Sequence, residues 1–331
     1  MELSEAGVPQ GALVFLDVSQ VDADDAHRVA ALVAAGTLPI IGISDREPAA
    51  QAMPLLEALT FTVVAAGDEL PPTCVHVPSV EDAVAALATS AEQAPLAALT
   101  LCELLRTTAS LPVPDALVAE SLAYSMLLGS AEFARWLPGR ERRPGRTPAG
   151  PPVLVSRDGT TLNVRLNQPE RRNAFDRSLR DALVEALEIA VYDETVAQVL
   201  VSGRGPAFCS GGDLDEFGTT PDVATAHVIR TTRSPARLIN QLRGRTHVVV
   251  HGACVGAGVE LAAFAGSVSA RPDASFWLPE LSMGLIPGAG GTVSLPRRIG
   301  RWRTAWLALT GTRIDAETAM IWGLVDARAN G

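Results

Sequence analysis

The chain has 331 residues, of which 47% are hydrophobic and 19% are charged. This balance argues against a disordered chain, and the length predicts two structural units, or one domain with a large extension, with a full core. The net charge of −10 argues against a nucleic-acid groove, because phosphate neutralisation needs a basic surface. All 27 basic residues are arginines, which excludes lysine Schiff-base chemistry and the lysine of a phosphate-binding P-loop.

The first residues and the cysteines indicate the compartment. Residues 1–5 are acidic and lack the features of a signal peptide, and no apolar run is long enough for a membrane span. The four cysteines, Cys74, Cys102, Cys209 and Cys254, contain no C-x-x-C pair, which favours reduced thiols over a metal site or disulfides. We therefore expect a cytoplasmic protein with no metal and with neither a membrane nor a nucleic acid as partner.

The N-terminal part of the chain has an α/β pattern followed by a helical block. Short apolar runs predict strands at 12–16, 38–43 and 61–65, with helices between them at 24–35 and 49–59. From 80 to 136 the apolar residues fall at helical spacing, and interrupting prolines divide the stretch into three predicted helices. A segment rich in Pro, Gly and Arg follows at 138–152 and predicts a linker.

After the linker the alternation of strands and helices resumes. The expected strands are 153–155, 161–166, 197–202, 247–250 and 267–270. The expected helices are 176–191, with Asp176 as its cap, a helix near 221–242, an apolar helix after 256, and further helices that reach 319.

Two glycine-rich turns follow buried strands in this second part. In the first, residues 206–214 (PAFCSGGDL), two adjacent glycines allow backbone N–H groups to face a ligand closely. The second, residues 251–264 (HGACVGAGVELAAF), leads into a helix whose first N–H groups favour negative charge on a ligand. Either segment could be only an ordinary turn, and the second lacks the third glycine of a dinucleotide-binding fingerprint.

Two glutamates lie in apolar stretches, where an uncompensated ionised carboxylate is costly. Glu260 belongs to the second glycine-rich segment, and Glu280 lies twenty positions later, before another glycine-rich turn. Two carboxylates in such surroundings can be held in different protonation states, one as a base and one as an acid. Alternatively, amides of the helix start satisfy Glu260, or either glutamate is an ordinary paired residue.

Together these segments resemble the crotonase (enoyl-CoA hydratase/isomerase) superfamily in order, spacing and residue type. The resemblance runs from about 153 to 327 and includes residues 170–175 (ERRNAF), which are similar to the family's motif beside the CoA site. It implies an α/β fold, a crotonase-like ββα superhelix with flanking helices. It also implies an oxyanion hole formed by the N–H groups of Gly212 and Ala257. The substrate or CoA contacts that it implies are Arg172, Asn173, Ala174, Phe208, Ser210, Gly211, Asp213, Leu214 and Gly256.

The resemblance further implies a reaction. Glu260 would activate water for attack at C3 of a 2-enoyl-CoA thioester, and Glu280 would deliver a proton to C2, giving a 3-hydroxyacyl-CoA. No cofactor is expected, because CoA is part of the substrate, and a homotrimer or hexamer is the expected assembly. The alternatives are a double-bond isomerase or another enolate-stabilising enzyme and, in a different class, a non-catalytic scaffold that binds acyl-CoA.

The order of the parts departs from the family pattern. Family members usually continue beyond the Gly-Leu-Val at 323–325 with several helices, whereas this sequence ends at 331. The block at 91–136 resembles such a tail, and residues 38–64 resemble a worn copy of the unit at 247–270. We therefore predict a degenerate crotonase-like copy at 1–137, a linker at 138–152 and a catalytic core at 153–331. The alternative for 1–137 is an unrelated α/β module with its own ligand.

A basic cluster precedes the last helices. Arg297, Arg298, Arg301 and Arg303 lie within seven positions. Such a cluster either contacts the phosphates of CoA or forms a solvated helix face.

Overall fold

The computed structural model describes residues 2–3, 9–67, 70–140 and 150–329. Most of the predicted linker therefore lies outside the described residues, at 141–149. The strands are β1 (Glu2–Leu3), β2 (Pro9–Gln10), β3 (Val14–Asp17), β4 (Ile40–Ser44), β5 (Phe61–Val64), β6 (Cys74–His76), β7 (Val153–Asp158), β8 (Thr161–Leu166), β9 (Gln198–Gly203), β10 (Ala207–Cys209), β11 (Thr246–Val250), β12 (Ala253–Val255), β13 (Ser267–Ala270), β14 (Ser275–Trp277), β15 (Ile314–Asp315) and β16 (Ala327–Arg328). The α-helices are α1 (Ala23–Ala35), α2 (Met53–Ala58), α3 (Val80–Gln93), α4 (Pro95–Thr108), α5 (Val113–Leu128), α6 (Ala131–Trp136), α7 (Arg177–Tyr192), α8 (Val223–Thr232), α9 (Pro235–Gln241), α10 (Ala257–Ala262), α11 (Gly291–Ser294), α12 (Pro296–Thr310) and α13 (Ala316–Ile321).

The C-terminal half contains two sheets, and the chain winds as a spiral that passes from one sheet to the other. One sheet has the order β16-β13-β11-β9-β8-β7 and the other the order β10-β12-β14-β15. Successive strands β9 and β10, β11 and β12, and β13 and β14 alternate between the sheets, so each turn of the spiral adds one strand to both. This arrangement is the predicted ββα superhelix.

Local sequence explains the main elements of this half. The strand β11 (THVVV) alternates buried and half-buried side chains, as a strand packed on one face requires. The helix α7 buries an apolar stripe that includes Leu179, Leu183 and Leu187. Asp176 caps this helix as predicted, since its Oδ1 accepts a hydrogen bond of 2.7 Å from the Leu179 N–H.

One predicted helix is wrong. The stretch expected as a single helix at 221–242 forms two helices, α8 and α9, which are separated at residues 233–234. Pro235 has no N–H to donate and restricts the residue before it, so the first helix ends there. Ser234 then caps α9 by accepting a hydrogen bond of 3.3 Å from the Arg237 N–H.

The N-terminal half contains a parallel sheet of order β3-β4-β5-β6 and then a block of four helices, α3 to α6, instead of the three predicted. The fourth helix was missed because it is short and its cap, Ser130, comes only two residues after α5 ends. The strand β6 was also missed, since it has only three residues. The domain boundaries assigned from the sequence stay a prediction.

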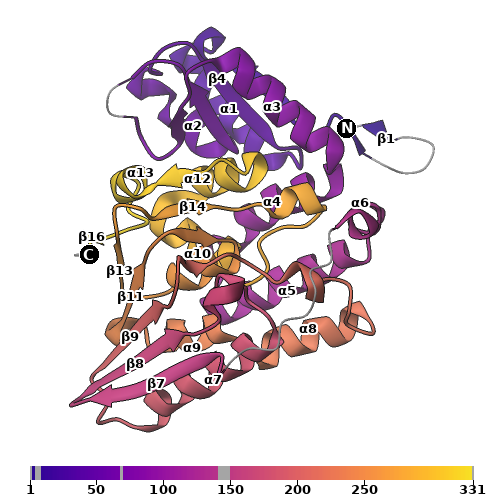
Figure 1. The fold of residues 1–331 in the computed structure, drawn as a ribbon. Coiled ribbons are helices and arrows are strands. Elements are labelled where there is room, and N and C mark those ends of the chain that lie inside the picture. The colour runs from indigo at the N-terminus through magenta and orange to yellow at the C-terminus, as the bar shows by residue number, and fades with distance from the viewer. Residues whose placement is uncertain (1, 4–8, 68–69, 141–149, 330–331) are drawn as a thin grey trace.

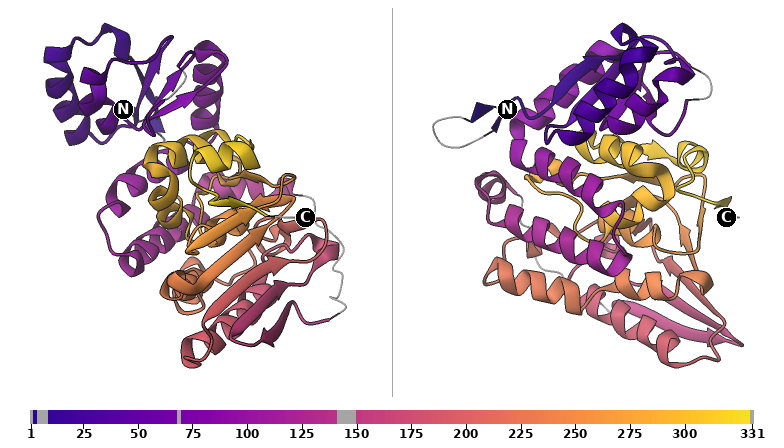
Figure 2. Two further views of the ribbon diagram at one scale, coloured as in Figure 1. Left: turned by 90° about the vertical axis from the view of Figure 1, so that its left-hand side faces the viewer. Right: turned by 180° about the vertical axis from the view of Figure 1, so that it is seen from behind.

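The two halves pack closely against each other. In Figure 1 the N-terminal sheet lies above α12, and the ring of Phe61 on β5 meets the ring of Trp306 on α12 edge to face, with centroids 5.7 Å apart. The helix α5 lies beside α8, and the view from behind in Figure 2 shows the helices of residues 95–136 crossing the back of the C-terminal half. Among the described helices, none has the length and hydropathy of a bilayer span.

Candidate active site

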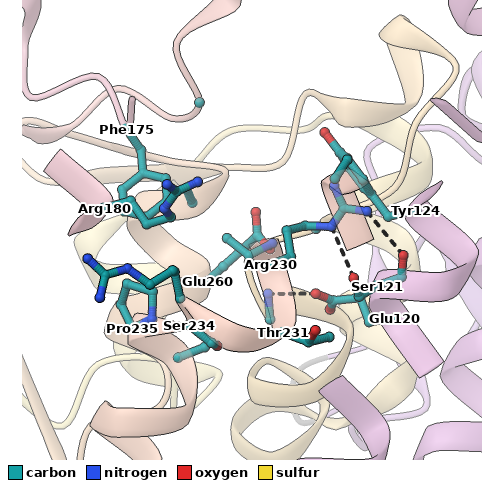
Figure 3. A pocket seen from close by; sticks show the side chains of 18 of the residues that line it. Glu120, Ser121, Tyr124, Phe175, Arg180, Arg230, Thr231, Ser234, Pro235 and Glu260 are labelled. Carbon is teal, nitrogen blue, oxygen red and sulfur yellow. Dashed lines mark hydrogen bonds between the residues drawn. The ribbon is translucent and has the colours of Figure 1, made fainter. Parts of the chain in front are cut away.

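A cavity of about 270 Å³ opens between the C-terminal half and helix α5. Its wall includes both of the predicted donor residues, both of the predicted catalytic glutamates and several side chains of α5. Figure 3 shows Glu120, Ser121 and Tyr124 entering from α5, opposite Glu260 and Phe175. The site is therefore assembled from both halves of the chain.

The two predicted donor amides are brought together by strand pairing. The strands β10 and β12 run parallel with Cys209 beside Cys254, so the turns that follow them lie side by side. The neighbours of Gly212 are engaged: the Phe175 N–H donates to the Gly211 carbonyl, and the Asp213 N–H donates to the Phe175 carbonyl. Within the described residues the N–H groups of Gly212 and Ala257 donate no hydrogen bond, and both residues line the cavity.

Gly256 precedes the second donor and has a backbone that only glycine adopts easily. Its φ is +45° and its ψ is −119°. A Cβ atom at this position would overlap Oε1 of Glu280. The absence of a side chain therefore allows both the turn into α10 and the position of the Glu280 carboxyl.

The two predicted catalytic glutamates are buried but differ in their partners. Glu260 is 2% exposed, and its Oε2 accepts hydrogen bonds from the N–H groups of Ala289 (2.7 Å) and Gly291 (2.8 Å). Glu280 is 8% exposed, and its buried Oε2 has no hydrogen-bond partner among the described residues. Two amide donors favour the ionised form of a carboxyl, and an unpartnered buried oxygen disfavours it.

The electrostatics of the cavity follow from this burial. Burial raises the pKa of Glu280 to about 8. Burial, with repulsion from Glu280 and Glu120, also raises the pKa of Glu260 well above its ordinary value, against the opposing effect of its two amide donors. Because like charges this close do not all ionise together, the cluster retains at least one proton at neutral pH.

Sequence reasoning missed a third glutamate in the cavity, Glu120 on α5. Its side chain is fully enclosed, and burial raises its pKa to about 7. The residues beside it include Tyr124, whose ring lies under the guanidinium of Arg230 with the Arg230 Cζ 4.7 Å from the ring centroid. The signal that identified Glu260, an acid inside an apolar helix, also applies to Glu120 in the apolar α5 sequence VPDALVAESLAYSMLL.

We expect the folded protein to lose stability as the pH rises from about 5 to about 8. The pKa values of Glu120 (about 7) and Glu280 (about 8) in the folded state lie above the ordinary value of 4.5. The folded state therefore holds protons that the unfolded chain has released, so this stability is full below about pH 4.5 and is lost through pH 7 to 8. Thermal unfolding followed by circular dichroism should show a fall in Tm of roughly 5 °C. A Tm that is constant or rises over this range would contradict the protonation of the cluster.

Most of the residues predicted to contact substrate or CoA lie around the cavity rather than in it. Asp213 lines the cavity, and Phe208 lines a small apolar space in the core. The others are not among the residues that line the cavity: Arg172, Asn173, Ala174, Ser210, Gly211, Leu214 and Gly256.

Asn173 lies in a network of buried hydrogen bonds. It is fully buried at a φ of +52°, its Oδ1 accepts from the Gln168 N–H at 2.8 Å, and its Nδ2 donates to three carbonyls. Those carbonyls belong to Arg204, Ala207 and Phe208, in and just before β10. The side chain thus fixes the strand that leads to Gly212, and its contact with substrate or CoA stays a prediction.

Replacing Asn173 with alanine should lower the free energy of unfolding by roughly 2–4 kcal/mol, because several buried polar groups would lose their partner. Chemical denaturation would measure this loss. The matched control is Asn163→Ala on β8, where the side chain is half-buried and no such network exists among the described residues. Equal effects of the two substitutions would show that the network is not important for stability.

The four arginines of the basic cluster at 297–303 are half-buried, so the cluster is not a solvated helix face, and its contact with CoA phosphates stays a prediction. Arg298 is 5% exposed at its side chain and donates to the carbonyls of Ala263 and Ala265. None of the four arginines lines the cavity. The arginines that do are Arg177, Arg180, Arg230, Arg233 and Arg237.

Other predicted absences concern metals and disulfides. In the part of the chain that the structure describes, no group of three or more His, Cys, Asp or Glu side chains is arranged to hold a metal ion. All four cysteines are buried and unpaired.

Comparison with known proteins decides the family. The sequence model of the enoyl-CoA hydratase/isomerase family matches residues 157–329, just over half of the chain. The chain belongs to this family. Its members here include 1,2-epoxyphenylacetyl-CoA isomerase of Escherichia coli (strain K12), 36% identical over 178 residues, covering 52% of this chain and 68% of the relative. They also include 2,3-dehydroadipyl-CoA hydratase of the same organism, 36% identical over 173 residues, covering 52% and 67%.

Solved structures of the family confirm the crotonase fold. The enoyl-CoA hydratase from Thermoplasma volcanium GSS1 superposes with a TM-score of 0.51 and 31% identity, over 55% of this chain and 73% of that one. The enoyl-CoA hydratase of Mycobacterium smegmatis superposes with a TM-score of 0.50 and 31% identity, over 54% and 70%. Family relatives carry both hydratase and isomerase names, so membership gives the enoyl-CoA hydratase/isomerase class as a whole.

Proposed function

We propose that the protein is an enoyl-CoA hydratase that adds water across the 2,3 double bond of a 2-enoyl-CoA thioester. One observation carries the proposal: two amides without hydrogen-bond partners among the described residues and two buried glutamates line a single cavity. The amides suit a thioester oxygen that becomes negative in the transition state, and the glutamates suit proton transfer at the adjacent carbons.

In the proposed reaction the thioester oxygen accepts hydrogen bonds from the N–H groups of Gly212 and Ala257. The carboxylate of Glu260 takes a proton from water as the water oxygen bonds to C3. The electrons of the double bond form an enolate, and C2 then takes the proton of Glu280. The product is a 3-hydroxyacyl-CoA, and passing the proton from Glu260 to Glu280 restores the site.

The pKa of Glu280 and the hydrogen-bond donors of Glu260 support this division of roles, while burial and repulsion act against the charge on Glu260. With a pKa of about 8, Glu280 carries its proton at neutral pH and can act as the acid. The two amides that donate to Glu260 favour its ionised form and hence its role as the base. The reaction moves only water and protons, so the proposal calls for no redox group or metal, and CoA enters as part of the substrate.

The proposal places the CoA phosphates near the arginines of the cavity wall. Arg177, Arg180, Arg233 and Arg237 are half-buried or exposed, and their guanidinium groups can bind phosphate oxygens in pairs. They supply a local positive charge on a protein whose net charge is −10. We also propose a homotrimer or hexamer, and a structural role for residues 1–137 as a degenerate copy whose helices cover the core.

A double-bond isomerase is the second candidate, and a relative named as an enoyl-CoA isomerase/hydratase favours it. The test is turnover of a panel of 2-enoyl-CoA and 3-enoyl-CoA esters by the full chain. Hydration of a 2-enoyl-CoA supports the proposal, whereas migration of a 3-enoyl double bond without hydration supports the isomerase. Thermal stabilisation by these thioesters without any turnover would overturn both in favour of a scaffold that binds acyl-CoA.

A further inference from the structure

Glu120 lies outside the part of the chain that matches the family, but its hydrogen-bond donors lie inside that part. Its Oε1 accepts from the Gly290 N–H at 2.7 Å. Its Oε2 accepts from the N–H of Thr292 at 2.9 Å and from the hydroxyl of the same residue at 2.6 Å. All three donors belong to the turn that enters α11, 170 or more positions away in the sequence.

The same turn holds Glu260. The N–H groups of Ala289 and Gly291 donate to Glu260, and those of Gly290 and Thr292 donate to Glu120. Successive amides therefore donate alternately to the two carboxyl groups, so that residues 289–292 are hydrogen-bonded to both glutamates. A displacement of this turn from the side of Glu120 must change the donors of Glu260.

We propose that Glu120 is a positioning residue of the catalytic site, through which the N-terminal half fixes the geometry and the charge of Glu260. The inference rests on the proposed function where it is tested by the pH profile of kcat, but its test by the pH dependence of Tm does not depend on that function. Glu120 does not need to touch the substrate. It acts by holding the shared turn and by adding a third carboxyl group to the cluster.

The groups that interact electrostatically with Glu120 come from every element around it. Arg230 on α8 is attractive, and Glu260 on α10, Glu280 in the 3₁₀ helix Glu280–Met283 and the Tyr124 hydroxyl on α5 are repulsive when ionised. Arg230 is held in place by hydrogen bonds to the hydroxyl (3.1 Å) and the carbonyl (3.2 Å) of Ser121. Negative charge on Glu120 raises the pKa of both catalytic glutamates, so removal of that charge should lower them.

The experiment compares Glu120→Gln with Glu132→Gln in the full chain. Glu132 is a matched control, since it is also a buried glutamate of the helical block and accepts from two amides, Leu96 N–H at 2.7 Å and Ala97 N–H at 3.1 Å, but it does not line the cavity. For the thioester that the wild type hydrates best, Glu120→Gln should lower kcat on the order of 10²-fold. It should also move the alkaline limb of the kcat profile to lower pH, whereas Glu132→Gln should leave that limb in place.

A second variant keeps the test valid if Glu120→Gln does not fold. Thr292→Val removes the hydroxyl that donates to Glu120 and leaves both donors of Glu260. Glu120 should then stay protonated to higher pH. Its smaller negative charge should lower the pKa of Glu280, so the alkaline limb should again move to lower pH. An unchanged limb in the variants that fold, whatever the change in kcat, would overturn the proposal and leave Glu120 a purely structural residue.

Thermal unfolding separates this inference from the proposed function. The fall in Tm between about pH 5 and about pH 8 should be smaller in Glu120→Gln than in the wild type, because one group with a raised pKa is gone. The fall in Glu132→Gln should match the wild type. If the wild type turns over no thioester, the proposed function fails, and a smaller fall in Glu120→Gln still supports its place in the cluster. An equal fall in all three proteins would overturn that place.

Discussion

Replacing Glu280 with glutamine should lower kcat for hydration of a short 2-enoyl-CoA by roughly 10³-fold while KM changes little. Glutamine fits the same space but has no proton to give to C2. In the wild type the rate should fall as the pH rises past about 8, where Glu280 loses its proton. This alkaline limb should disappear from the residual activity of the variant. Initial rates across the pH range measure both effects.

The companion variant is Glu260→Gln, which removes the base and should cost a similar factor. The N–H groups of Ala289 and Gly291 both donate to Oε2, so the side-chain oxygen of glutamine can still accept from them, and Tm measured beside kcat checks that the fold is kept. Hydration by both variants at the rate of the wild type would show that the acid and the base are wrongly assigned. Glu132→Gln again controls for the general effect of losing a buried carboxyl group.

Replacing Gly256 with alanine should reduce kcat by roughly 10²- to 10³-fold, the usual cost of losing one oxyanion donor. The new Cβ would overlap Oε1 of Glu280, and the backbone at a φ of +45° would be strained by about 1–3 kcal/mol. Relief of either conflict turns the Ala257 N–H away from the cavity or displaces the acid. Steady-state kinetics and thermal unfolding on the same preparations measure the two consequences.

The control for this substitution is Gly244→Ala. Gly244 is exposed, and a Cβ there would meet no atom within 4 Å. This variant should keep the kcat and the Tm of the wild type. Should Gly256→Ala behave in the same way, the turn before α10 would not need the geometry described here, and Ala257 would not be supported as a donor.

The sequence predicts well those parts of the site that depend on local pattern. The strands at 247–250 and 267–270, the cap at Asp176 and the two glycine-rich turns are each written in a few consecutive residues, and the structure places the turns side by side through the pairing of β10 and β12. The break between α8 and α9 was missed, although Pro235 marks it in the sequence.

Other parts depend on contacts that a local pattern does not contain. Glu120 accepts a hydrogen bond from a residue 170 positions away, so the sequence around Glu120 does not indicate its partners. The side-chain amide of Asn173 donates to carbonyls more than thirty positions away, and no local pattern predicted these contacts. A motif identifies which residues matter more reliably than it identifies what each of them contacts.

The alternating hydrogen bonds of the amides at 289–292 limit how far the chain can be truncated without loss of the site. A fragment trimmed to the family match at 157–329 would retain every predicted catalytic residue but would lack Glu120. Its Gly290 and Thr292 amides would have no acceptor, and the surface that α5 covers would be open to water. We expect such a truncated enzyme to be inactive because it lacks Glu120 and the cover of α5, although it would retain every residue that we propose to take part in the reaction itself.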